Sequence, residues 1–540
     1  MIQFIIDNMA PLMFAALVVF LLLGYPVAFA LGAIGLTFGF LGVELGLLHP
    51  ALFQALPERI FGIMANDTLL AVPFFTFMGL ILERSGMAED LLDTIGQLFG
   101  PIRAGLAYAV VLVGALLAAT TGVVAASVIS MGLISLPIML RYGYNRQLAT
   151  GVIAASGTLA QIVPPSLVLI ILADQLGRSV GDMYAGAIFP ALVLTGLYLS
   201  YIFLRSMVQP DSAPALPPEA RTLRGVKLLR RVLFVLIPPL TLIFLVLGTI
   251  FLGIATPTEG GAMGATGALI QAMINRRLNW SLLRQAMNTT AKLSSFVIFI
   301  LIGSTVFGLT FRAVNGDLWV EHLLTGLPGG QVGFLVVVNI LVFLLAFFLD
   351  FFELAFIIVP LLGPVADKLG IDLIWFGVLL AVNMQTSFMH PPFGFALFYL
   401  RSVAPAKQYV DKVTGKLTAP ITTGQIYWGA VPFVVIQMIM VGIVIAFPGL
   451  VTGNLEHIKT DPSSVEIVIP PSGYEVQDES YPGAMGDEEE GGEVEDDVSD
   501  LEAAFGAPER DGESSASEDA AGAPEEDDGR SALERELMGE

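Results

Sequence analysis

Two proline pairs interrupt apolar stretches of this chain, and each could expose backbone oxygens that bind a ligand. Pro164-Pro165 lies in SGTLAQIVPPSLVLIILA, and Pro391-Pro392 lies in MQTSFMHPPFGFALFYL. Proline lacks the amide N–H and clashes with the preceding turn, so each pair is predicted to break a helix and to leave carbonyl groups free. At membrane depth, free carbonyls are tolerated only where protein buries them or where they line a polar cavity. The two breaks are therefore predicted to mark a binding site.

A second candidate for chemistry is a pair of carboxylates within an apolar stretch, FFLDFFELAF. Asp350 and Glu353 are three residues apart, which places both side chains on one face of a helix. Ionisable groups at membrane depth are costly, so they are candidates for function. The pair is interpreted as a site of cation coordination or proton coupling. The alternative interpretation is a helix end at which both groups face water or a polar interface.

The proline pairs belong to an internal repeat with an offset of 227 residues, the separation of Pro164 and Pro391. Paired, interrupted apolar segments at corresponding positions of two halves indicate the binding site of a secondary transporter. The chain is therefore divided into a first transmembrane repeat (1–208), a linker (209–231), a second transmembrane repeat (232–452) and a tail (453–540). The same offset relates further helix-breaking positions: Pro101 to Pro328, Pro137 to Pro364 and Gly143 to Gly370.

Oxygen ligands near the breaks predict sites for Na⁺, since unwound backbone and half-helix ends coordinate such cations in transporters. One Na⁺ site is predicted at Thr121, Gly122, Ala160, Val163 and Pro165. The offset and the carboxylate predict a second Na⁺ site at Phe348, Asp350, Ser387, His390 and Pro392. Further residues near the breaks are predicted to line a substrate cavity: Pro73, Thr158, Ser166, Glu353, Asn383, Gln385 and Thr386. His390 is alternatively a proton site or, as is more common for such a histidine, a hydrogen-bonded packing residue.

The composition indicates a helical membrane protein. Hydrophobic residues make up 55% of the 540 residues, the mean hydropathy is +0.77, and apolar runs such as 233–254 are long enough to span a bilayer. The net charge of −22 comes from the tail, since residues 461–540 contain 27 acidic residues and 3 arginines. The tail is predicted to be disordered, as a solubilising extension or as a docking segment for a partner. Neither part is predicted to bind nucleic acid. With no cysteine and four scattered histidines, no metal site besides those for Na⁺ is predicted.

Loop charges predict that the two repeats are inverted, because cytoplasmic loops carry an excess of Lys and Arg. The loop before the first proline pair contains Arg141 and Arg146, whereas the loop before the second pair, 367–372, contains two aspartates and one lysine. After the pairs the bias is reversed, with two aspartates and one arginine at 174–182 but four basic residues at 401–416. The basic linker is then cytoplasmic, and both termini and the acidic tail are periplasmic.

These features together predict an all-α polytopic membrane protein with two inverted-topology repeats, broken helices and re-entrant hairpins. The hairpins are expected at two short apolar stretches, 69–82, which includes Pro73, and 293–311. An enzyme would need a nucleophile–base pair or a metal cluster. The sequence contains no such constellation, so the chain is not expected to be an enzyme. A membrane scaffold would not require paired breaks at a fixed offset.

Six segments carry motifs that recur in a known family: LLAVPFFTFMG (69–79), TTGVVAASVISMG (120–132), SGTLAQIVPPS (156–166), ATPTEGGAMGA (255–265), FFLD (347–350) and NMQTSFMHPPFG (383–394). Together they resemble the large membrane subunit of tripartite ATP-independent periplasmic (TRAP) transporters, the DctM-like family, over residues 5–450. The resemblance implies a Na⁺-driven symporter for uptake of organic acids (carboxylates) across the bacterial inner membrane. It also implies the elevator-type movement of the broader ion-transporter superfamily.

The resemblance further implies two partner proteins. One is a small four-helix membrane subunit (DctQ-like), and the other is a periplasmic substrate-binding protein (DctP-like). No cofactor is implied, and Na⁺ is the expected coupling ion. The alternative is a stand-alone ion-coupled carboxylate transporter that needs no binding protein.

Overall fold

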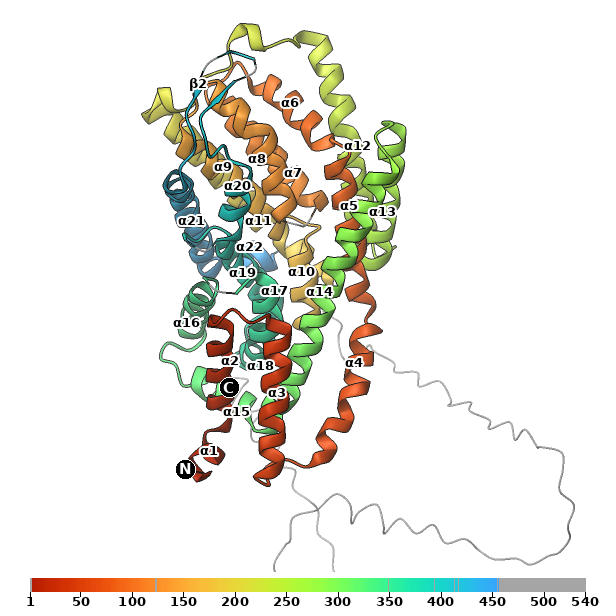
Figure 1. The fold of residues 1–540 in the computed structure, drawn as a ribbon, viewed down its shortest axis with the longest axis vertical. Helices are drawn as coiled ribbons and strands as arrows, with labels where there is room; N and C mark the ends of the chain where they lie inside the picture. Colours follow the sequence, from red (N-terminus) through yellow and green to blue (C-terminus); the bar gives the residue numbers. More distant parts are fainter. Residues whose placement is uncertain are drawn as a thin grey trace, which may run out of the picture. The chain divides into compact units, whose positions relative to one another are not determined.

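The computed structural model describes residues 2–453 and 455, with the exceptions of 122, 123, 348, 393, 412 and 416. Among the described residues, six helices are long and apolar enough to cross a bilayer, or up to eight spans if each of two bent helix pairs counts as one. The prediction of an all-α polytopic membrane protein is confirmed (Figure 1). The predicted tail lies almost wholly outside the described residues.

The first half of the chain is helical up to a polar linker. Its elements are α1 (Ile2–Asp7), α2 (Met9–Leu22), α3 (Val27–Glu44), η1 (Pro50–Ala55), α4 (Leu56–Met64), α5 (Asp67–Arg84), α6 (Met87–Phe99), α7 (Gly105–Thr121), α8 (Val124–Arg141), α9 (Arg146–Thr158), η2 (Leu159–Gln161), α10 (Leu167–Gln175) and α11 (Val180–Val208). The linker carries two short 3₁₀ turns, η3 (Pro210–Ser212) and η4 (Pro218–Ala220).

The second half repeats this order of helices. Its elements are α12 (Gly225–Phe251), α13 (Pro257–Ile274), α14 (Trp280–Ala313), α15 (Gly316–Thr325), α16 (Gly330–Leu345), α17 (Phe351–Glu353), the π-helical turn η5 (Leu354–Ile358), α18 (Val359–Lys368), α19 (Leu373–Met384), η6 (Gln385–Phe388), α20 (Phe395–Val403), α21 (Thr423–Ala446) and α22 (Gly449–Thr452). Between α20 and α21, β1 (Tyr409–Val410) and β2 (Leu417–Thr418) form a small antiparallel ribbon.

Two segments form antiparallel helical hairpins: α7 with α8 in the first repeat, and α16 with the α17–α18 segment in the second. The backbone N–H of Leu106, at the start of α7, donates to the hydroxyl of Tyr144, just after α8, at 3.2 Å. In the second repeat, Nε2 of Gln331, at the start of α16, donates to the carbonyl of Leu369, just after α18, at 2.7 Å. Each hairpin therefore begins and ends on one face of the protein. Its arms of 16 to 18 residues reach about 25 Å inward.

The hairpins do not lie where the short apolar stretches predicted them, so that prediction was wrong. Residues 69–82 belong to the continuous helix α5, and residues 293–311 belong to α14, which is 34 residues long. In α5, the side chain of Asn66 accepts from the backbone N–H groups of Thr68 and Leu69, so the helix begins before the apolar stretch. Polar residues at both ends lengthen the helix beyond its apolar part, and Pro73 lies inside it.

The end of α8 and the end of α10 lie on opposite faces of the helical body. The backbone N–H of Asn145, after α8, donates to the carbonyl of Ser212 at 2.8 Å, which places the end of α11 beside the end of α8. Because α11 has 29 residues, it is about 43 Å long. Its start, and with it the end of α10, therefore lies on the far face.

Two ion pairs then establish the inverted relation of the repeats. Arg141, at the end of α8, pairs with Asp411, after α20, at 2.7 Å, and this hydrogen bond holds the pKa of Asp411 below its usual value. Arg178, after α10, pairs with Asp367, near the end of α18, at 3.4 Å. Since α18 corresponds to α8 and α20 to α10, each pair joins the hairpin of one repeat to the broken helix of the other. Equivalent helices thus end on opposite faces, as predicted.

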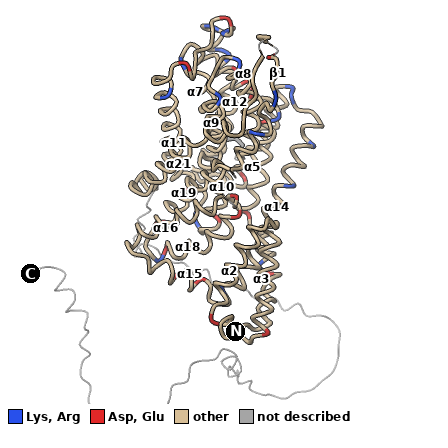
Figure 2. Tube along the Cα trace, turned by 60° about the vertical axis from the view of Figure 1, so that its left-hand side comes forward, with Lys and Arg blue, Asp and Glu red and all other residues tan. Residues whose placement is uncertain are grey.

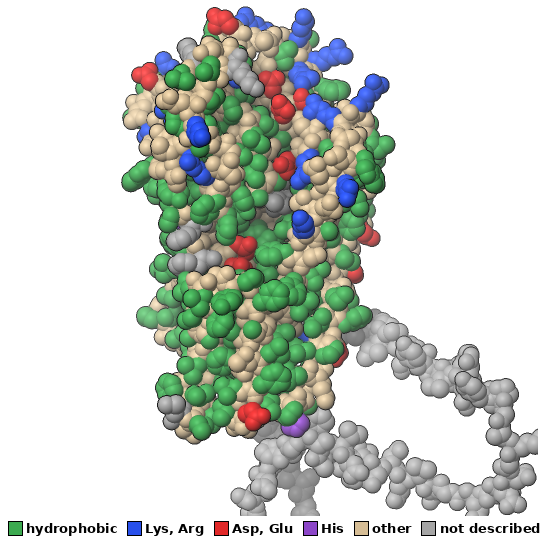
Figure 3. All heavy atoms as spheres, in the orientation of Figure 1, with side chains coloured by type: hydrophobic (Ala, Val, Ile, Leu, Met, Phe, Trp, Pro, Cys, Tyr) green, Lys and Arg blue, Asp and Glu red, His purple; other side chains and the backbone are tan. Residues whose placement is uncertain are grey.

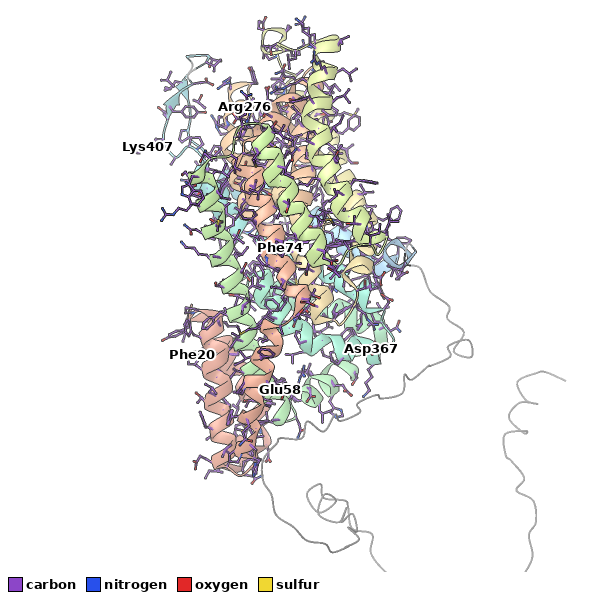
Figure 4. All side chains as sticks on the ribbon, turned by 90° about the vertical axis from the view of Figure 1, so that its right-hand side faces the viewer. Phe20, Glu58, Phe74, Arg276, Asp367 and Lys407 are labelled. Carbon is purple, nitrogen blue, oxygen red and sulfur yellow. The ribbon has the colours of Figure 1, made fainter. Side chains whose placement is uncertain are left out.

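Charged residues are also distributed unequally between the two opposite ends of the helical body. Lys and Arg gather at the end of the helical body that carries β1 and the end of α8, while the sides are largely hydrophobic (Figures 2 and 3). Arg276 and Lys407 lie at this end, and Glu58 and Asp367 lie toward the other (Figure 4). The basic end is the one that loop charges assign to the cytoplasm.

Paired glycines bring α9 and α21 into close contact. A Cβ atom added to Gly151 would lie 2.0 Å from the carbonyl oxygen of Gly429, and one added to Gly429 would lie 2.2 Å from the carbonyl oxygen of Gln147. Small residues at a helix crossing let two backbones approach in this way. The broken helix of the first repeat is thereby fixed against the last long helix of the second.

We predict that Gly151→Ala destabilises the protein, because the new methyl group forces α9 and α21 apart at a cost of roughly 1–3 kcal/mol. Gly196→Ala in α11 is the matched control, since no atom lies within 4 Å of its added Cβ. Thermal unfolding in detergent, followed by size-exclusion chromatography, measures both. Equal melting temperatures for the two variants would contradict the close crossing.

Candidate functional site

Both proline pairs break a helix, as predicted. In the first repeat, α9 and η2 end at Gln161, and α10 begins at Leu167 after Pro164-Pro165. In the second repeat, η6 ends at Phe388 and α20 begins at Phe395 after Pro391-Pro392. The peptide bond between the two prolines is cis in each loop. Equivalent loops thus interrupt equivalent helices.

The first loop is closed by Ser166, which caps α10. Its hydroxyl donates to the carbonyl of Gln161 at 2.6 Å and accepts from the backbone N–H of Val168 at 3.2 Å. Among the described residues, no donor reaches the carbonyl oxygens of Val163 and Pro165. Ala160 is fully buried in the η2 turn. Part of the predicted oxygen set of the first Na⁺ site is therefore available for a ligand.

One predicted member of this first set, Thr121, lies at the hairpin tip. Thr121 is the last residue of α7, and Gly122 lies outside the described residues. The first described residue after the tip is Val124, which begins α8 and lines the same cavity as Gln161 and Leu167. The hairpin tip and the first proline loop therefore approach one cavity.

The second loop uses its oxygens differently. The carbonyl of His390 accepts from the backbone N–H of Gly394 at 2.6 Å, and the carbonyl of Pro392 accepts from the hydroxyl of Tyr427 at 3.1 Å. The hydroxyls of Thr386 and Ser387 donate one turn back, to the carbonyls of Asn383 (2.6 Å) and Met384 (2.5 Å). Several groups predicted to form the second Na⁺ site or the substrate cavity thus already have a hydrogen-bonding partner. Phe348, also predicted, lies outside the described residues.

His390 is a packing residue in this arrangement. Its ring lies 4.1 Å from the ring of Phe343, edge to face, and 4.3 Å from that of Phe347, stacked. The side chain is buried, and neither ring nitrogen has a partner among the described residues. The packing agrees with the commoner interpretation of this histidine, although the expected hydrogen bond is not present among the described residues.

Asp350 and Glu353 form a reciprocal capping box at the start of α17. Asp350 Oδ1 accepts from the backbone N–H of Glu353, and Glu353 Oε2 accepts from the backbone N–H of Asp350, both at 3.1 Å. Such a box satisfies N–H groups that a helix start leaves unpaired. The two residues therefore cap the start of a helix. Asp350 also lines a cavity. Capping uses one carboxylate oxygen of Asp350 and leaves the other for a ligand.

Thr158 and Gln385, both predicted to line a cavity, contact each other instead. Gln385 Nε2 donates to Thr158 Oγ1 at 3.2 Å, across a sequence separation of 227. A residue can touch its own repeat equivalent only at the symmetry axis that relates the repeats. Gln437 Nε2, from α21, approaches Thr158 Oγ1 at 3.5 Å and the hydroxyl of Tyr198 at 2.9 Å. This buried polar cluster therefore marks the pseudo-twofold axis.

Asn383 likewise contacts a neighbouring helix. Its Nδ2 donates to the backbone carbonyl of Asn339, on α16, at 2.8 Å and to the Oδ1 of the same residue at 3.0 Å. This contact ties the hairpin of the second repeat to its broken helix.

A cavity of about 270 Å³ lies where both hairpin ends and both loops meet. Of the predicted residues, Asp350 lines it. Gln161, which was not predicted, also lines it; this residue is fully buried, and its amide atoms have no partner among the described residues. Its polar character beside the proline pair was the signal that could have identified it. The lining residues are Val124, Ala125, Gln161, Leu167, Leu293, Phe296, Asp350, Phe351, Phe352, Phe388, Phe395 and Tyr399.

Inverted repeats with two hairpins and two broken helices around a central cavity define a class, the secondary membrane transporters. A family model described as "Tripartite ATP-independent periplasmic transporter, DctM component" matches residues 14–450. The chain therefore belongs to the DctM family of TRAP transporter large permeases.

Individual relatives agree with this assignment. The C4-dicarboxylate TRAP transporter large permease protein DctM of Pseudomonas aeruginosa is 31% identical over 362 residues, covering 66% of this chain and 82% of that protein. The isethionate TRAP transporter permease protein DctMQ of Oleidesulfovibrio alaskensis is 28% identical over 421 residues, covering 77% of this chain and 64% of that protein. The crystal structure of the YdaH transporter of Alcanivorax borkumensis is similar in fold, with a TM-score of 0.52 and 16% identity over 75% of this chain and 90% of that one.

The capping box predicts different effects for two substitutions of Asp350. Asp350→Ala removes the cap and should destabilise the protein by about 1 kcal/mol, whereas Asp350→Asn keeps a good cap and should leave the melting temperature unchanged. Thermal unfolding of the purified variants in detergent measures the difference. A large destabilisation by Asp350→Asn would mean that the charge, not the cap, supports the fold.

Proposed function

We propose that this chain is the transmembrane transport subunit of a Na⁺-coupled tripartite importer of organic acids (carboxylates). The observation that carries the proposal is the convergence of both helix breaks and both hairpins on one cavity that contains Asp350 and Gln161. A site enclosed by two inverted repeats can open to either face when one part of the protein moves relative to the other.

The charges of the cavity explain why the substrate would need Na⁺. Among the described residues that line it, one is a carboxylate, Asp350, and none is Lys or Arg. A carboxylate substrate placed there would meet a like charge in a medium of low polarity, which is strongly unfavourable without compensation. Na⁺ held by carbonyl oxygens of the first loop, such as those of Val163 and Pro165, would supply that compensation. On this proposal, the substrate binds in the cavity only together with Na⁺.

The names of the relatives support the proposed substrate class and partners. C4-dicarboxylates and isethionate, which their names specify, are small organic anions. We propose a periplasmic binding protein and a small four-helix membrane subunit as partners, in accord with the tripartite family and with the name DctMQ of a longer relative. The complex would lie in the bacterial inner membrane, with the acidic tail in the periplasm.

Uptake in proteoliposomes that contain this chain and both partners tests the proposal. We expect uptake of a labelled C4-dicarboxylate when an inward Na⁺ gradient is imposed, and loss of uptake when K⁺ replaces Na⁺. Undiminished uptake without Na⁺ would refute the coupling. Uptake that persists when the binding protein is omitted would favour the stand-alone carrier.

Asp350→Asn in the same assay separates charge from capping. If Asp350 is a Na⁺ ligand, the variant should need at least about tenfold more Na⁺ for half-maximal uptake, since a charged ligand is replaced by a neutral one. Glu353→Gln is the matched control, because glutamine also completes a capping box and Glu353 does not line the cavity. Unchanged Na⁺ dependence in Asp350→Asn would remove this residue from the site.

A further inference from the structure

A second cavity, of about 430 Å³, lies between α4, α10, α14 and the η5–α18 segment. Its polar lining includes Arg59, Asn66, Asp174, Ser304, Thr305 and Arg312. Asp174 lies at the end of α10, on the face opposite the basic end of the helical body. The cavity is therefore on the side that loop charges assign to the periplasm.

The two arginines of this cavity have no carboxylate partner. Neither Arg59, on α4, nor Arg312, near the end of α14, forms an ion pair with a described residue. The one carboxylate of the lining, Asp174, is held by amides instead: its Oδ1 accepts from Asn66 at 2.7 Å and its Oδ2 from Gln175 at 2.9 Å. The cavity thus has an excess of positive charge.

This second, outer cavity shares a wall with the central cavity, the one that contains Asp350 and Gln161. Along α14, Phe296 lines the central cavity and Ser304 lines the outer one, eight residues or about 12 Å apart. Phe352 lines the central cavity and Phe356 the outer one, and their rings are nearly parallel with centroids 6.4 Å apart. An aromatic partition therefore separates the two spaces.

We infer that the outer cavity is an anion-binding vestibule in which Arg59 and Arg312 hold the acid group of a small organic anion before it enters the central cavity. A guanidinium matches carboxylate and sulfonate oxygens with paired N–H donors. Clefts lined by one sign of charge also concentrate ligands of the opposite charge. The direction of transfer rests on the proposed import function, whereas anion binding at the arginines does not.

The absence of cysteine from the sequence permits a direct test by site-specific labelling. Gly308→Cys places a thiol in the cavity at a position with no atom within 4 Å, and Thr305→Cys is a second reporter should the first not fold. The full-length protein, purified in detergent without Na⁺ or binding protein, is treated with a neutral maleimide. We expect succinate or isethionate to slow labelling severalfold, and uncharged succinamide to have no effect.

Charge substitutions identify the groups that hold the anion. In an Arg59→Gln/Arg312→Gln background, protection should require about tenfold more succinate, because two charge-assisted contacts are lost. Arg59→Lys/Arg312→Lys, which keeps both charges but loses the paired donors, should retain part of the protection. Arg178→Gln, on the same face but outside the cavity, should behave like the wild type. Leu318→Cys, exposed on α15, is a reporter that no anion should protect.

Two outcomes would overturn the vestibule. One is that neither anion protects either reporter. The other is that only the binding protein protects them, which would make this face a docking surface instead. These results are distinct from failure of the proposed function. Protection together with Na⁺-independent uptake would support the vestibule and refute the coupling. Na⁺-driven uptake without protection would support the coupling and refute the vestibule.

Discussion

A helix interrupted within a bilayer frees backbone carbonyls that lipid cannot satisfy, and the rest of this fold follows from that constraint. The Val163 and Pro165 carbonyls of the first loop, which have no partner among the described residues, are tolerated because protein encloses the loop. The enclosing elements include α21, which packs on α9 through Gly151 and Gly429 at backbone distance. The second repeat thus helps to cover the broken helix of the first.

The repeats are symmetric in backbone but not in chemistry. Thr158 and its equivalent Gln385 meet on the pseudo-twofold axis, so the two broken helices cross there. Away from the axis the loops diverge, because the carbonyl of Pro392 accepts from Tyr427 while that of Pro165 has no described partner. The second half instead contributes the carboxylate of Asp350. If the proposed Na⁺ sites exist, the duplicated scaffold would form one of them through backbone oxygens and the other through a side chain.

The sequence predicted the features that depend on backbone chemistry and lipid. Proline pairs, the 227-residue offset and loop charges led to broken helices and inverted repeats, since proline and the bilayer act on any chain alike. The hairpins were predicted at the wrong positions because the length of an apolar stretch does not distinguish a single span from a hairpin. Residues 106–140 resemble one long span but form the two arms α7 and α8. Residues 69–82 resemble a short hairpin, but polar residues at both ends extend them into one longer helix. Pairings such as Asn383 with Asn339 were beyond prediction, because they depend on how helices far apart in sequence pack. Gln161, by contrast, could have been identified from its polar side chain close to the first proline pair.

The two cavities have opposite charge character, and this difference constrains how an anion would cross. Of the described lining residues, those of the outer cavity include two arginines and one carboxylate, whereas those of the central cavity include one carboxylate and no basic residue. An anion would therefore leave the vestibule only if the central site is made equally favourable, which bound cations can do. The vestibule must also bind weakly, or it would trap its ligand. Arg59 and Arg312 are exposed, and their attraction for an anion is correspondingly screened by water. With weak capture outside and cation-dependent binding inside, the Na⁺ gradient, and not the affinities of the sites, would set the direction of net uptake.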